Sequence, residues 1–86
     1  MFFNTKEKSV NEFAMLIGKM NAETFLGVAK ILNVKLFYDD AKDERGKPLP
    51  RTAEAIIEDC LVNFYSLNRE RRKGLIKMAR AATKEQ

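Results

Sequence analysis

The stretch TAEAIIEDCLVNFYSL, residues 52–67, decides the fold class of this 86-residue chain. Its apolar residues recur at spacings of three and four, which is typical of an amphipathic α-helix with one buried face. These residues are Ala53, Ile56, Ile57, Cys60, Leu61, Phe64 and Leu67. Thr52 is suited to cap the first turn, while Glu54 and Glu58 lie away from the apolar stripe. We therefore predict a helix that begins after Thr52.

The N-terminal third of the chain predicts two more helices. Ser9 and Glu12 have the spacing of a capping box, in which a hydroxyl and a carboxylate each bind a free backbone N–H at a helix start. Asn21 is the predicted N-cap of the next helix. The two apolar stripes are Val10, Phe13, Ala14, Ile17 and Met20 in the first helix and Ala22, Phe25, Ala29, Leu32 and Leu36 in the second.

Residues 34–51 interrupt the helical pattern. Residues 39–48 are rich in charge and include Gly46 and Pro48, which indicates a solvated linker. Residues 34–38 fit either a short extended segment or the frayed end of the second helix. The linker is therefore predicted without regular structure, apart from that open choice.

The two halves of the chain match at an offset of 47 residues. Asn68 aligns with Asn21 and is the predicted N-cap of a last helix that runs to about Ala82, and Gly74 aligns with Gly27. We predict an all-α single domain, residues 1–86, of four helices in two αα-hairpins, 9–33 and 52–82, joined by the charged linker. Either a true structural repeat or the general likeness of amphipathic hairpins explains the match.

Composition limits where the protein works. A single cysteine excludes an intramolecular disulfide framework. The start of the chain turns polar after Phe3, which is too soon for a signal peptide, and no apolar run is long enough to span a membrane. We expect a cytoplasmic protein without membrane contact.

Catalytic chemistry is scarce in this sequence. The absence of histidine removes the commonest general base and most zinc ligation. Cys60 lies on an apolar stripe, where it is expected to act as a small buried hydrophobe. The carboxylates within residues 39–44 lack the spacing of a calcium-binding loop. Glu54 and Glu58 have no pocket in which they could act as an acid–base pair. We expect no catalytic residues, no metal site, no cofactor and no enzymatic activity.

The last helix carries the clearest candidate site, a basic stripe of Arg69, Lys73, Lys77, Arg80 and Lys84. At 100° per residue these side chains fall within an arc of about 80°, opposite Leu75, Met78, Ala79 and Ala82. Such a stripe predicts contact with DNA or RNA phosphates. The alternatives are an ordinary solvated face or an acidic protein partner, including the Glu54/Glu58/Asp59 surface of a second copy.

A second candidate surface is apolar. Met15, Ile31, Val62 and Tyr65 lie off the inward stripes and predict an exposed band for a protein partner or a homodimer. The alternative is that a four-helix core needs stripes wide enough to bury all four.

Two resemblances add to this interpretation. Residues 25–34 resemble the last helix of Cro/repressor-type helix-turn-helix domains, and residues 67–82 are similar to the linker helix that follows such domains. The chain departs from that pattern because the region before Phe25 leaves no room for a two-helix DNA reader. Residues 13–25 and 67–72 resemble small accessory proteins of bacterial phages and mobile elements. That resemblance implies a small accessory protein that acts by binding; a protein-directed adaptor or inhibitor is the alternative.

Overall fold

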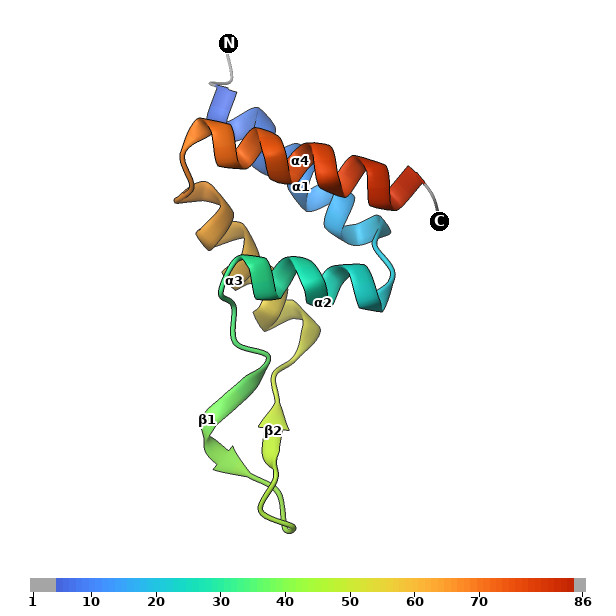
Figure 1. The fold of residues 1–86 in the computed structure, drawn as a ribbon. Coiled ribbons are helices and arrows are strands. Elements are labelled where there is room, and N and C mark those ends of the chain that lie inside the picture. Colours follow the sequence, from blue (N-terminus) through green and yellow to red (C-terminus); the bar gives the residue numbers. More distant parts are fainter. Residues whose placement is uncertain (1–4, 85–86) are drawn as a thin grey trace.

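The structure, a computed structural model, describes residues 5–84 and is mainly helical (Figure 1). Its elements are α1 (Thr5–Lys19), α2 (Ala22–Ile31), β1 (Phe37–Lys42), β2 (Pro48–Pro50), α3 (Ala53–Tyr65) and α4 (Arg69–Lys84). Four helices therefore occupy the two predicted hairpin regions. The all-α prediction is right only for these regions, because a small antiparallel sheet lies between them. The N-terminal residues 1–4, on which the signal-peptide expectation rests, lie outside the described residues.

Three of the predicted N-caps are confirmed. Each uses a side-chain oxygen that accepts a backbone N–H three residues further on, which satisfies one of the free donors of the first turn. These bonds join Thr24 N to Asn21 Oδ1 (2.8 Å), Ala55 N to Thr52 Oγ1 (3.2 Å) and Arg71 N to Asn68 Oδ1 (2.9 Å). The starts of α2, α3 and α4 are thus fixed by local sequence.

The predicted capping box at Ser9 is wrong. α1 begins at Thr5, so Ser9 lies one turn inside the helix. Residues 5–8 contain no glycine or proline that would prevent the helix from beginning before Ser9. The carboxylate of Glu12 binds Arg80 of α4. A tertiary ion pair has replaced the local cap.

The end of α2 settles the choice left open for residues 34–38. Asn33 adopts a left-handed backbone conformation with φ 58°, which asparagine tolerates better than most residues. Its N–H binds Lys30 O (3.0 Å), and Val34 N–H binds Ala29 O (2.9 Å). This pair of bonds is the Schellman motif that ends helices. The chain leaves α2 there, and Val34 is buried while residues 37–42 form a strand.

The predicted unstructured linker is instead a β-hairpin that extends away from the helices (Figure 1). Phe37 lies opposite Pro50 and Lys42 opposite Pro48. Asp43 organises the turn, since its Oδ1 accepts the N–H groups of Arg45 (2.8 Å) and Lys47 (2.9 Å). Gly46 supplies the left-handed conformation, φ 80°, that the turn requires. Charged residues that indicated a solvated linker are thus exposed parts of a regular hairpin.

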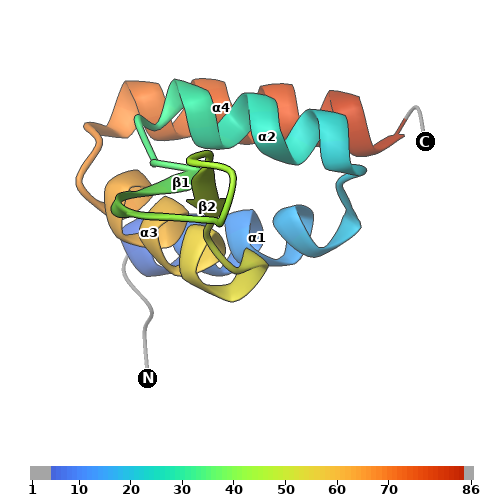
Figure 2. The same ribbon diagram turned by 90° about the horizontal axis from the view of Figure 1, so that it is seen from below.

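The core lies where the two helical hairpins cross. α1 contacts both α3 and α4, and α3 also contacts α2. Seen from below, α2 and α4 form one layer and α1 and α3 the other (Figure 2). At the centre, the rings of Phe13 and Phe64 stack with centroids 4.2 Å apart and planes 10° apart. Both side chains are completely buried. The remaining core residues are Leu16, Ile17, Val28, Ala29, Leu32, Val34, Ile56, Cys60, Leu75, Ile76 and Ala79.

The offset of 47 residues extends to the burial of side chains in α2 and α4. The two helices begin 47 residues apart, at Ala22 and Arg69. Buried residues match one for one at the same offset: Val28 with Leu75, Ala29 with Ile76, and Leu32, the C-cap of α2, with Ala79. The two hairpins therefore present the same face of their second helix to the core.

Replacing Phe64 with alanine tests the central stack. We expect Phe64→Ala to lower the free energy of unfolding by about 3–5 kcal/mol, because the cavity lies between α1 and α3. Urea unfolding followed by circular dichroism measures the change. Met15→Ala on the exposed face of α1 is the control, expected within about 0.5 kcal/mol of wild type; equal effects would contradict the assigned core.

Removing the β-hairpin tests whether the helices need it. Arg51 N–H binds Leu36 O (2.8 Å), so the two ends of the hairpin are already adjacent. Replacing residues 37–50 with an Asn-Gly turn should change the free energy of unfolding by less than about 1 kcal/mol, since the hairpin buries no core residue and loop length has a weak effect. Loss of the helical circular dichroism signal would contradict an independent helical body.

Candidate functional site

Helix α4 is fixed to the domain along one edge only. Leu75, Ile76 and Ala79 are buried on that edge. The predicted basic stripe lies beside it, and all of its members are exposed: Arg69, Lys73, Lys77, Arg80 and Lys84. Burial of the apolar edge thus holds the stripe at the surface, as an interface with a large partner requires.

Three stripe residues surround a recess between α4 and α1. Lys73, Lys77 and Arg80 line it together with Ile76, and α1 contributes Ser9 and Glu12. The recess has a volume of about 490 Å³. Sequence reasoning missed the α1 residues, because nothing in the spacing of α1 shows that it lies beside α4.

Arg80 is the one stripe residue held in an ion pair within the described part of the chain. Its Nη2 donates to Glu12 Oε1 (2.6 Å) and its Nε donates to Glu12 Oε2. The hydrogen bonds from Arg80 lower the pKa of Glu12, and those to Glu12 raise the pKa of Arg80. The sequence had suggested that all five basic side chains are available to a partner. Because of this pair, Arg80 is already bound within the domain.

The other four basic side chains of the stripe form no ion pair with residues 5–84. Helix geometry places Lys8 and Lys19 within about 40° of Glu12 on α1, so the positive surface continues onto that helix. Glu70 lies at the margin of the stripe, about 20° around α4 from Lys77. The α1–α4 surface is therefore basic, with Glu12 near its centre.

All four residues of the predicted apolar band are exposed. Met15, Ile31 and Val62 are each 58% exposed and Tyr65 is 47% exposed. They come from three helices, α1, α2 and α3. The Lys6 Nζ lies 4.0 Å from the centre of the Tyr65 ring, whereas Ile31 lies in a groove beside α4.

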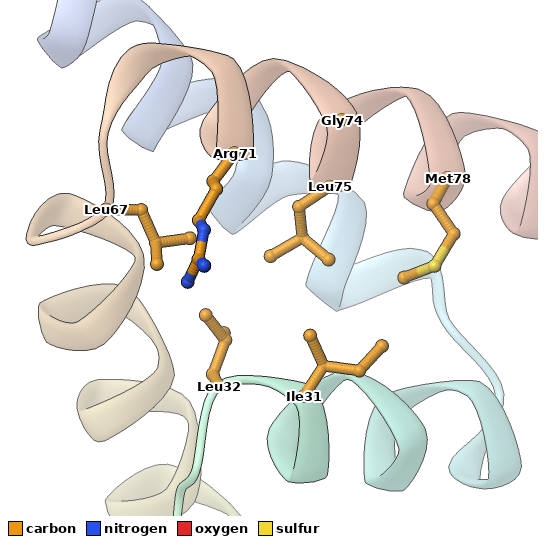
Figure 3. Close-up of a pocket in the computed structure, with 7 residues that line it drawn as sticks. All are labelled: Ile31, Leu32, Leu67, Arg71, Gly74, Leu75 and Met78. Atoms are coloured by element: carbon orange, nitrogen blue, oxygen red, sulfur yellow. The ribbon is translucent and has the colours of Figure 1, made fainter.

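That groove runs between α2 and α4 and was not predicted (Figure 3). Its lining residues are Ile31, Leu32, Leu67, Arg71, Gly74, Leu75 and Met78, around a volume of about 340 Å³. Met78, expected on the buried stripe, is 41% exposed here. The groove stays open because α4 rests mainly on α1, and α2 on α3.

The candidate side chains for catalysis or metal binding, Cys60 and the carboxylates of residues 39–44, Glu54 and Glu58, line neither the recess nor the groove. Cys60 is fully buried, and burial together with the Asp59 carboxylate raises the pKa of its thiol to about 11. Within residues 5–84, no three histidine, cysteine or carboxylate side chains are grouped as they would need to be to hold a metal ion. In the same range, no helix is long and apolar enough to cross a membrane.

Comparison with known protein families, with curated proteins and with solved structures finds no match for this chain.

Replacing Glu12 with glutamine tests the Glu12–Arg80 pair. The lowered pKa of Glu12 means that the pair stabilises the fold above the unfolded value of 4.5 and that this contribution is lost as pH falls through the lower folded pKa. Glu12→Gln should therefore be slightly less stable than wild type at pH 7. Urea unfolding at several pH values should show the difference shrink toward pH ~3; a difference independent of pH would exclude the pair as its cause.

Proposed function

We propose that this chain is a small non-catalytic binding protein whose α4 stripe contacts the phosphate backbone of DNA or RNA, or a complex that handles nucleic acid. The observation that carries the proposal is the exposure of Arg69, Lys73, Lys77 and Lys84 along one edge without ion-pair partners among the described residues. These side chains extend over about 22 Å of helix. That length corresponds to about six nucleotides of one strand.

The proposed contact is with the backbone and not with base edges. The stripe contains lysine and arginine but no asparagine or glutamine, and α4 has no aromatic residue to stack on a base. Binding should therefore depend strongly on salt and weakly on sequence.

Glu12 has a defined part in this proposal. Its carboxylate occupies Arg80 in the free protein, so a phosphate must displace it to reach the guanidinium. The cost limits the affinity of the stripe. The resemblance to accessory proteins of phages and mobile elements supports a role of this kind and leaves the process unspecified.

The second candidate function is a protein-directed adaptor or inhibitor. The α2–α4 groove favours it, because its lining is mostly apolar and includes the exposed residues Ile31 and Met78. Exposed apolar grooves of this kind commonly seat a partner helix.

Charge reversal on the stripe tests the first function. Lys73→Glu/Lys77→Glu should weaken binding to generic duplex DNA roughly 100-fold at about 50 mM salt, because two phosphate contacts are lost. Fluorescence anisotropy titrations at several salt concentrations measure the affinity, and the salt slope should fall by about 2. Glu12→Gln should bind more tightly than wild type, since it releases Arg80.

The matched control is Lys42→Glu/Lys47→Glu on the exposed β-hairpin, which changes the net charge equally. We expect it to bind nearly as well as wild type. Equal losses in the two double variants, or no wild-type binding to duplex DNA, single-stranded DNA or RNA, would refute the phosphate-binding function.

A further inference from the structure

The α2–α4 groove has a polar end and an apolar end. The Arg71 guanidinium lies at the end near Leu67, and Ile31, Leu75 and Met78 line the rest (Figure 3). Arg71 forms no ion pair with any described residue. The groove therefore suits a helix with acidic side chains in one turn and apolar side chains in the next turns.

The outer face of α3 has this chemistry. Glu54, Glu58, Val62 and Tyr65 are spaced 4, 4 and 3 residues apart and fall within an arc of about 80°. All four are exposed, and neither glutamate forms an ion pair with residues 5–84. Two acidic positions followed by two apolar ones form the kind of stripe by which a helix binds a groove.

We propose that the outer face of α3 of one copy docks into the α2–α4 groove of a second copy. Apart from Gly74, which has no side chain, the groove residues of the C-terminal hairpin are Leu67, Arg71, Leu75 and Met78, and these four have the same 4, 4 and 3 spacing as the α3 face. The α3 face, residues 54–65, extends over about 16 Å of helix. With α3 parallel to α4, Glu58 lies beside Arg71, Val62 beside Leu75, and Tyr65 beside Met78. Glu54 then lies beside Leu67 at the outer end of the groove.

Charge explains why the occupant is another copy of this chain. α3 contains Glu54, Glu58 and Asp59 and no basic residue, whereas α4 contains seven basic residues and Glu70. Bringing α3 to α4 therefore joins the most acidic helix to the most basic one. Gly74 in the groove wall has open space where a side chain would be, so the incoming helix can approach closely.

This contact joins two different surfaces, so each copy keeps one free groove or one free α3 face. Association is then head-to-tail and gives rings or chains. The basic stripe lies on the opposite edge of α4 from the groove. It stays accessible in every copy, and the inference does not depend on the stripe binding nucleic acid.

Two double variants test the contact by sedimentation velocity at increasing protein concentration. The groove variant is Ile31→Asp/Met78→Asp and the face variant is Val62→Asp/Tyr65→Asp. All four positions are exposed, so both variants should fold, which circular dichroism verifies. Wild type should show a mass that rises with concentration at about 50 mM salt, and each variant should remain a monomer. Met15→Asp, with the same 58% exposure as Ile31 and Val62, should behave as wild type.

Mixing the two variants gives the decisive result. The face variant retains an intact groove and the groove variant retains an intact α3 face, so a 1:1 mixture should form a heterodimer and nothing larger. A wild-type chain that stays monomeric up to about 1 mM would overturn the proposal. So would a mixture that stays monomeric, because it would show that an intact groove and an intact α3 face do not bind each other.

Discussion

The stack of Phe13 on Phe64 is the contact on which the rest of the structure depends. It joins α1 to α3, the first helices of the two hairpins, at the centre of the core. The second helices then rest on the opposite hairpins, α4 on α1 and α2 on α3. Because α2 packs on α3 and α4 packs on α1, α2 and α4 do not need to pack against each other to complete the core. A groove therefore remains between them.

The surfaces of α4 follow from this arrangement. One edge is buried by α1 and the core, and the edges on either side are left with different chemistry. Toward α1 the helix presents lysine and arginine, whereas toward α2 it presents Leu75, Met78 and the lone guanidinium of Arg71. A single amphipathic helix thus offers two separate surfaces, one suited to an extended anion and one to an apolar helix face.

The sequence was sufficient to predict the features that depend on residues within one helical turn of each other. Asn21, Thr52 and Asn68 identified helix starts, because a cap acts on a donor three residues away. It failed at Ser9, where the partner of Glu12 lies 68 residues away, and at the β-hairpin, whose strands are exposed on both sides and so show no alternation. The basic stripe followed from helical spacing, while the groove depends on how two helices are held apart and has no local signal.

Cys60 is a buried thiol whose chemical modification reports when the core of this small domain opens. Its thiol is sealed between the hairpins, so a thiol reagent can reach it only when they separate. No second cysteine competes for the reagent. Under native conditions the rate of Cys60 alkylation therefore measures how often the core opens. Any ligand that bridges the hairpins must lower this rate.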